Sequence, residues 1–156
     1  MTTFPFKNRR VRATFPDHFS LRYERNGYIE ASAGRDAPIT LRLSLHPSED
    51  LRRPPEFGTT MVRMQALHAG QALIDAGPAC YFYAGQDDRF AADDVVIRYW
   101  KCGFRSWVVG ASATIRKSHV GHPAVAAVEA ELPAIFASLE ELPRPSALMR
   151  LIYRFV

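Results

Sequence analysis

The chain has 156 residues, a formal net charge of +4, 47% apolar residues and 23% charged residues. This length fits one domain with one core that needs neither a metal nor a disulfide to stay folded. The composition excludes a disordered chain, and no apolar run approaches the ~20 residues that a membrane-spanning helix requires.

Four short strands are predicted in the N-terminal third. Residues 1–10 read as a flexible arm in front of them. Apolar side chains then alternate with polar ones, and Asn26-Gly27 is a strong hairpin signal because both residues tolerate a positive φ. In the last strand every second residue from Ile39 to Leu45 is apolar, so that face is core. The predicted strands span 11–15, 19–24, 28–33 and 39–46.

A helix is predicted after a polar, proline-containing connection. Thr59 or Thr60 can cap its first turn, and Gly77 can end it after about Asp75. The apolar residues of this segment do not form a single stripe, so a strand over 61–68 stays open as an alternative.

The next segment predicts a strand, an acidic loop and a hairpin. The aromatic stretch 79–84 is β-forming by composition, and 85–94 is an acidic loop. The apolar stretches 95–101 and 105–115 flank Cys102-Gly103, which we expect to lie in the tight turn.

The last long element is an amphipathic helix from Pro123 to about Leu142. Proline suits the first turn of a helix, whereas Pro133 removes an internal hydrogen bond and should kink it. Residues 143–156 then form an amphipathic tail, which we expect to dock on its own domain, on a partner or on a second copy in a homodimer. The core-facing stripe contains Val125, Val128, Leu132, Ile135 and Leu139, at steps of three and four.

These elements indicate an α+β fold. The predicted domain spans 11–142 and consists of an antiparallel β-sheet of about six or seven strands, packed by two main helices as an α/β sandwich, with a short C-terminal helical tail. Cys80 and Cys102 lie in apolar, strand-like sequence. We expect buried thiols, and pairing across adjacent strands stays open.

No catalytic motif is present in the sequence. It lacks a nucleophile elbow and the glycine-rich patterns that bind nucleotides. His119 and His122 have no third ligand at a suitable spacing, and the acidic loop lacks the pattern of a calcium site. We therefore expect no enzyme activity, no metal and no cofactor.

The N-terminus and the charge pattern predict a cytoplasmic protein that binds no nucleic acid. No apolar region with a following cleavage site is visible, so no secretory signal is expected. Arginine supplies most of the 20 basic residues, and these are scattered among acidic ones instead of forming one stripe with aromatic residues.

One region suits contact with a protein partner. Aromatic and arginine side chains are the usual anchors of interfaces. Trp100 and Trp107 are expected in the core, which leaves the hairpin tip and the acidic loop beside the hairpin. The candidate partner-binding residues are Asp87, Asp88, Asp93, Asp94, Lys101, Phe104 and Arg105.

Four segments carry a family resemblance: FSLRY (19–23), Tyr99-Trp100, WVVGASATI (107–115) and IFASLEEL (135–142). Together they resemble the PsbP-like α/β sandwich family, in its opening strand, late hairpin and closing helix. The chain departs from that family at Glu24, where a proline is common, and after Pro143. The resemblance implies a non-enzymatic binding or assembly factor, because members of this fold class are mostly of that kind.

Small bacterial proteins that look like this include immunity proteins. The leading hypothesis is therefore a bacterial protein-binding domain that sterically neutralises a toxin delivered by a contact-dependent or type VI secretion system. The alternative is small-ligand or lipid binding, in a pocket between sheet and helices lined by Tyr81, Tyr83 and Tyr99. The resemblance carries no functional residues, because function belongs to sites and not to folds.

Overall fold

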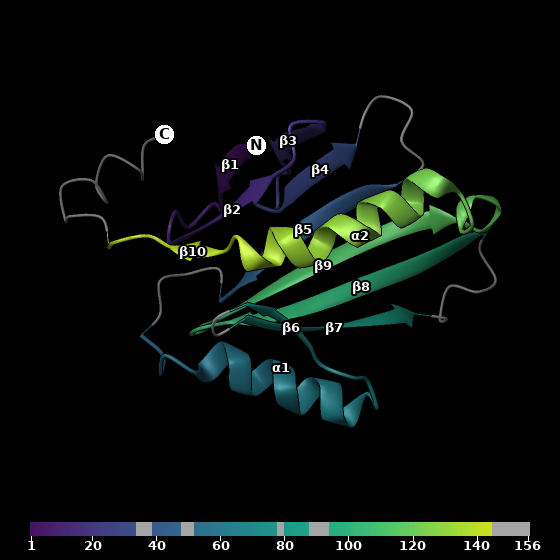
Figure 1. The fold of residues 1–156 in the computed structure, drawn as a ribbon. Coiled ribbons are helices and arrows are strands. Elements are labelled where there is room, and N and C mark those ends of the chain that lie inside the picture. Colours follow the sequence, from purple (N-terminus) through teal and green to yellow (C-terminus); the bar gives the residue numbers. More distant parts are fainter. Residues whose placement is uncertain (34–38, 48–51, 78–79, 88–93, 145–156) are drawn as a thin grey trace.

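The computed structural model describes residues 1–33, 39–47, 52–77, 80–87 and 94–144 (Figure 1). These residues form a seven-stranded antiparallel sheet, a three-stranded sheet and two α-helices. The predicted α+β class, with helices packed on a sheet of six or seven strands, is confirmed. The predicted C-terminal tail lies outside the described residues from position 145 onward.

The large sheet has the strand order β3-β4-β5-β9-β8-β7-β6, and the small sheet has the order β1-β2-β10. In chain order the elements are β1 (Thr2–Pro5), β2 (Val11–Phe15), β3 (Phe19–Tyr23), β4 (Ile29–Ala33), β5 (Thr40–His46), α1 (Phe57–His68), β6 (Ile74–Gly77), β7 (Cys80–Asp87), β8 (Val95–Phe104), β9 (Trp107–Arg116), a 3-10 turn (Lys117–His119), α2 (Pro123–Ala137) and β10 (Glu140–Glu141).

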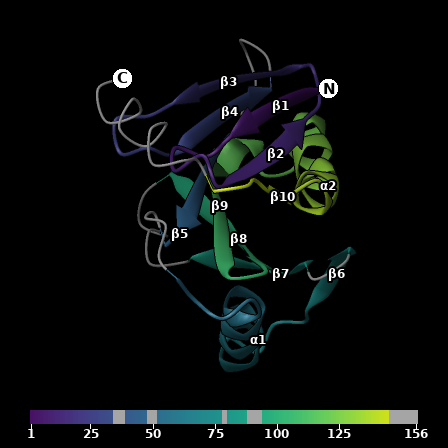
Figure 2. The ribbon, with the colours of Figure 1, turned by 90° about the vertical axis from the view of Figure 1, so that its left-hand side faces the viewer.

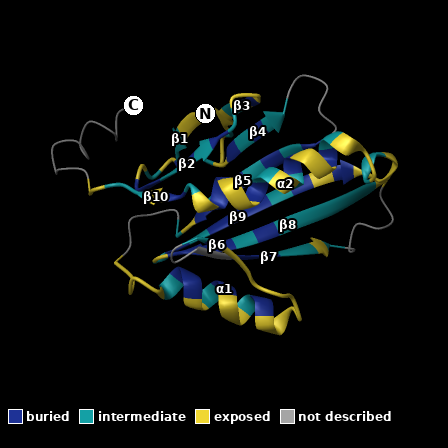
Figure 3. Cartoon of the chain, viewed as in Figure 1, coloured by how far each residue is buried: buried dark blue, intermediate teal, exposed yellow. Residues whose placement is uncertain are grey.

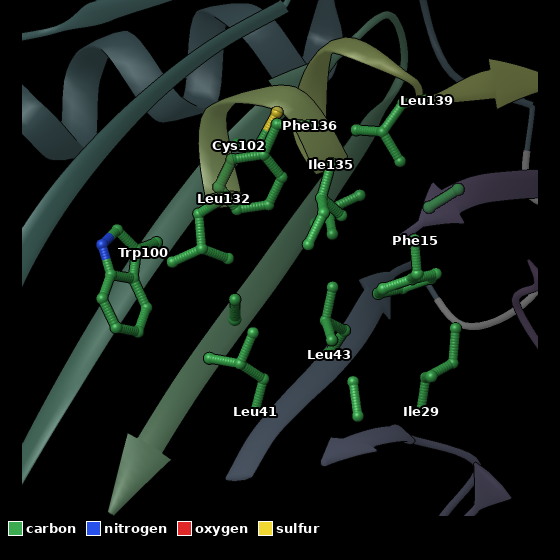
Figure 4. Packing of buried hydrophobic residues seen from close by; sticks show 14 of the residues in the cluster. Phe15, Ile29, Leu41, Leu43, Trp100, Cys102, Leu132, Ile135, Phe136 and Leu139 are labelled. Atoms are coloured by element: carbon green, nitrogen blue, oxygen red, sulfur yellow. The ribbon is translucent and has the colours of Figure 1, made fainter. Parts of the chain in front are cut away.

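Helix α2 and the small sheet cover one face of the large sheet and enclose the main core. Buried residues alternate along β2, β5 and β9, and they follow the inner strands in Figure 3. The predicted stripe of α2 is buried throughout, and Leu139 joins it just beyond the end of the helix. Figure 4 shows Leu132, Ile135 and Phe136 packed over Leu41 and Leu43 of the sheet.

Helix α1 lies on the opposite face of the large sheet, against β7, β8 and β9 (Figure 2). Successive strand residues point to opposite faces, so Phe82 packs against Phe136 of α2 while Tyr83 packs against Val62 and Ala66 of α1. The sheet is therefore covered on both faces at this edge.

The start of α1 touches the β8–β9 hairpin backbone to backbone. A Cβ atom added to Gly58 would lie 1.9 Å from the carbonyl oxygen of Trp107, and one added to Gly103 would lie 2.6 Å from the carbonyl oxygen of Gly58. The Gly58 and Thr59 amides both donate to the carbonyl oxygen of Arg105, at 2.8 and 3.4 Å. Only glycine permits this approach, because any side chain at either position would enter the other backbone.

The N-terminal segment is not the flexible arm that the sequence predicts. Residues 2–5 form β1, which pairs with β2 from Thr2↔Phe15 to Pro5↔Arg12. Phe6 and Arg10 are only 1% and 6% exposed. Burial of an aromatic ring near the end of the chain fixes the segment, and the sequence pattern before residue 11 is too short to reveal this.

The two helices differ from prediction at their ends. Helix α1 begins at Phe57, two residues before the predicted threonine cap, and it excludes the alternative strand over 61–68. It ends at His68, because the chain turns at Gly70 with φ +63° and returns as β6. Helix α2 ends at Ala137 because Ser138 Oγ accepts the Thr14 amide at 2.8 Å, and the next residues pair with β2 as β10.

The hairpin turn is displaced from its predicted position. Phe104 pairs with Trp107, so the turn lies at Arg105-Ser106, and both Cys102 and Gly103 belong to β8. The register pairs Cys102 with Phe82 and places Cys80 opposite Phe104, so the two cysteines are not directly opposed. Cys102 is buried, as expected.

We predict that Gly58→Ala lowers the free energy of unfolding by about 2 kcal/mol or more, because the new methyl group meets the Trp107 carbonyl and neither backbone can retreat. Urea denaturation measures the effect. Gly121→Ala is the matched control: no atom lies within 4 Å of its added Cβ, and the change should stay within about 0.5 kcal/mol. Equal effects of the two substitutions would contradict the close approach.

Candidate functional site

The structure separates the two halves of the predicted partner-binding region. The connection from β7 to β8 holds the acidic residues, and the β8–β9 turn holds Arg105. These lie at opposite ends of β8, a strand of 10 residues and thus ~30 Å long (Figure 1). The sequence predicts that the hairpin tip and the acidic loop form one contact surface, but the described acidic residues Asp87 and Asp94 lie at the end of β8 opposite to the turn.

The individual predicted residues also differ in their surroundings. Asp94 is exposed and Asp87 is half-buried, while Asp88 and Asp93 lie outside the described residues. Phe104 is 6% exposed and belongs to the core. It is therefore not the exposed anchor that was expected, because the shifted turn directs its ring inward. Trp100 and Trp107, expected in the core, are there. Lys101 and Arg105 remain accessible.

A cavity of about 380 Å³ lies at the end of the sheet that carries the β8–β9 turn, on the left in Figure 1. Its lining comes from the β1–β2 connection, the segment before α1, the β8–β9 turn and the region of β10. We call this the arginine cavity. It is lined by Arg10, Arg52, Arg53, Pro55, Arg105, Ser106, Trp107, Glu141 and Arg144.

The arginine cavity concentrates the charge of the protein. Five guanidinium groups and one carboxylate give its lining a formal charge of +4, which equals the net charge of the whole chain. The remaining charged residues therefore balance. The sequence pattern suggested scattered basic residues because these five arginines come from four separate segments, and only the fold brings them together.

Arg10 forms the inner wall of the arginine cavity. Its Nη2 lies 3.1 Å from Glu141 Oε1, and its Nε donates to the Leu142 carbonyl oxygen at 3.3 Å. Its Cζ atom lies 5.9 Å from the centre of the Trp107 ring. A buried guanidinium group requires such partners, since an isolated charge is expensive to desolvate. Arg10 is thus held in place by contacts within the protein.

Arg105 forms the outer wall and has an unfavourable backbone conformation. Its φ is +51°, in the left-handed region where glycine and asparagine are favoured. Its Nη1 lies 3.3 Å from Glu141 Oε2, so the two oxygens of one carboxylate are shared between Arg10 and Arg105. Strained non-glycine residues concentrate at functional sites. The conformation itself is held by the two α1 amides that bind the Arg105 carbonyl.

Trp107 lines the arginine cavity and carries an unpaired donor. The side chain is 2% exposed, and its Nε1 is buried without a hydrogen-bond partner among the described residues. A buried N–H group that lacks an acceptor costs roughly 1–3 kcal/mol. An indole N–H only donates, so only a hydrogen-bond acceptor can pair with it.

Lys101 lies on the other face of the sheet, in a second polar region. Its partner in the ladder, Gly110, is also paired with Ser44 of β5, two residues before His46. Burial and, next, the charge of Lys101 hold the pKa of His46 below its ordinary value. His46 also lines a separate cavity of about 430 Å³ that includes Asn8, whose buried Nδ2 has no partner among the described residues.

The tyrosines of the alternative ligand-binding hypothesis pack against one another. Tyr83 is 5% exposed beneath α1, and the Tyr99 ring meets it edge to face with the centroids 6.3 Å apart. Burial raises the pKa of Tyr83, and Tyr99 adds to the effect. The side chain of Tyr81 lies outside the described set. Tyr83 thus packs between α1 and the sheet.

The histidines of the 119–122 segment have a structural role. His122 Nδ1 accepts the Ala124 amide at 3.1 Å and caps α2, while the ring of His119 lies 6.1 Å away. Within the described ranges, no three His, Cys, Asp or Glu side chains gather as a metal ion would require. None of the helices described there is long and apolar enough to cross a membrane.

We predict that an NMR titration of His46 gives a pKa below the ordinary value of about 6.5. Between the two pKa values the unfolded chain binds more protons, so the contribution of His46 to stability falls as the pH drops through this range. Lys101→Gln should raise the His46 pKa part of the way, and Lys117→Gln, at the far end of β9, should leave it unchanged. If Lys101→Gln leaves the pKa of His46 unchanged, the charge of Lys101 is not a cause of the lowered pKa.

Comparison with known proteins finds no matching family model and no match among curated proteins. The fold is similar to a solved structure from Bacteroides thetaiotaomicron VPI-5482, with a TM-score of 0.62 and 14% sequence identity. The match covers 91% of this chain but only 48% of that chain, so this protein corresponds to about half of its structural neighbour. At this identity the likeness extends to the fold alone.

Proposed function

We propose that this chain is a non-catalytic protein-binding domain whose arginine cavity and surrounding surface contact an acidic patch on a partner protein. The observation that carries the proposal is the concentration of charge: the lining of one cavity holds the whole formal net charge of +4. A positive patch of this kind steers an acidic partner toward one end of the sheet and fixes its orientation.

The type of side chain also supports a protein contact. Arginine is enriched at the energetic centres of interfaces, and its planar guanidinium group binds a carboxylate through two parallel hydrogen bonds. Arg53 is exposed and stacks on Phe57 with its Cζ atom 4.4 Å from the ring centre, which orders a side chain that is otherwise costly to immobilise. The arginines are therefore partly ordered before the partner binds.

The proposal changes the predicted contact surface. Arg105 stays in it, whereas Phe104 is core, Lys101 faces the other side of the sheet, and Asp87 and Asp94 lie at the far end of β8. A partner that covers the arginine cavity does not need the acidic residues.

The specific form of the proposal is a cytoplasmic bacterial immunity protein. Its support is the sequence resemblance to PsbP-like proteins, whose fold class consists mostly of binding and assembly factors. The toxin that it neutralises would present acidic residues around its active site, and the β8–β9 turn would block that site sterically. A basic inhibitor fits such a toxin better than a nuclease, whose active-site face is usually basic.

We predict that Arg105→Glu abolishes capture of the partner from a lysate of the source organism, because the reversed charge repels the acidic patch. The immobilised wild-type chain and the variant are compared by mass spectrometry of the retained proteins. For the purified pair, Arg105→Glu should raise the Kd at least tenfold, about 1.4 kcal/mol, and added salt should weaken wild-type binding.

Arg116→Glu is the matched control. The substitution makes the same change of charge at an exposed residue. Strand β9 begins at Trp107 and ends at Arg116, so Arg116 lies at the other end of the sheet. We expect it to retain the partner. A wild-type chain that captures nothing, or a partner that both variants retain equally, would refute a protein contact at the arginine cavity.

A further inference from the structure

We propose that the arginine cavity is a binding site for a single oxyanion group, a carboxylate or a phosphate, whose oxygens accept hydrogen bonds from Trp107 Nε1 and from the surrounding guanidinium groups. This inference rests on the proposed function for its choice of site, but it names the chemistry that the site recognises and can be tested without the partner.

The sign of the charge favours an anion. Five guanidinium groups surround a space of about 380 Å³, and among the described lining residues Glu141 alone carries a carboxylate. Like charges at this density repel one another, and the repulsion is stronger where the surroundings exclude water, as they do around Arg10. A bound anion reduces that repulsion. A cation would increase it, and an apolar group would leave it unchanged.

The buried indole of Trp107 points to the same kind of ligand independently of charge. The side chain lines the cavity and is only 2% exposed. Its Nε1 is a buried donor without an acceptor among the described residues. Native proteins rarely leave such a donor unpaired. An indole N–H cannot bind a cation or another donor. The charge of the lining and the orphaned indole therefore require the same kind of ligand.

The cavity already holds one carboxylate. Glu141 Oε1 lies 3.1 Å from Arg10 Nη2, and Glu141 Oε2 lies 3.3 Å from Arg105 Nη1. Two guanidinium groups on distant parts of the chain thus converge at the separation that the two oxygens of one oxyanion span. The cavity can therefore hold an oxyanion between its guanidinium groups.

The conformation of Arg105 also favours a functional role. At φ +51° a glycine would be less strained, and because the side chain is 58% exposed, its contacts with Glu141 and with the Phe104 ring contribute little to stability. Residues that cost stability and face a cavity are the ones that function retains. Arg105→Gly should therefore fold at least as well as the wild type and bind oxyanions more weakly.

The test is an NMR titration that observes Trp107 directly. The chain has two tryptophans, so the ¹⁵N-labelled protein gives two indole N–H signals, and Trp100→Phe identifies the one from Trp107. The probes are inorganic phosphate and the blocked peptide acetyl-Asp-Glu-Asp-Glu-amide, with acetyl-Asn-Gln-Asn-Gln-amide as the neutral control, all at one ionic strength.

We expect a saturable shift of the Trp107 signal with phosphate, with the acidic peptide or with both, no shift with the neutral peptide, and a Trp100 signal that stays in place. Arg105→Gly should raise the Kd about tenfold while its thermal midpoint stays equal to or above that of the wild type. Arg116→Gln should leave the Kd unchanged.

The two probes, phosphate and the acidic peptide, distinguish the source of the oxyanion. A response to phosphate alone assigns the cavity to a small free anion and removes the support that it gives to a protein contact. A response to the acidic peptide assigns it to acidic side chains of the partner. A Trp107 signal that responds to neither probe, or that responds equally in Arg105→Gly, overturns the inference. If Arg105→Glu loses the partner while the Trp107 signal shifts with neither probe, the proposed protein contact stands and the oxyanion site is rejected.

Discussion

The contact between the first turn of α1 and the β8–β9 hairpin is the constraint on which the rest of the site depends. Gly58 allows two backbones to touch, and the Gly58 and Thr59 amides bind the Arg105 carbonyl. This interaction fixes the turn in a left-handed conformation that an arginine does not prefer. It also brings the segment before α1, with Arg52 and Arg53, against the end of the sheet. A backbone contact of this kind is rigid, because no rotamer can relieve it.

The second sheet completes the site from the other side. Strand β10 pairs with β2 just beyond α2, and the pairing places Glu141 between Arg10 and Arg105. Trp107 belongs both to the end of the main core and to the wall of the cavity. The packing that buries its ring also separates its Nε1 from any acceptor among the described residues. Stability of the hydrophobic core and preorganisation of the charged site are coupled by this one indole ring.

The electrostatic field of the cavity follows from the charge and geometry of the arginine side chain. A guanidinium group stays charged at any physiological pH and carries five donors in a fixed plane. Collecting several of them around a concave surface focuses the field there. Asp87 and Asp94 at the far end of β8 are separated from this field by the length of the strand, so they do not cancel it.

Local sequence determined most strands of the large sheet and the two helices, because the alternation of apolar residues along β5 and β9 and the three-four stripe of α2 reflect the contacts that each element makes with one core. The turn at Arg105, the strand formed by residues 2–5 and the pairing of β10 depended on partners far away in the chain. The same holds for the candidate site: the arginines carry no local pattern, and only the tertiary structure gathers them, since their proximity follows from strand order and from one glycine contact.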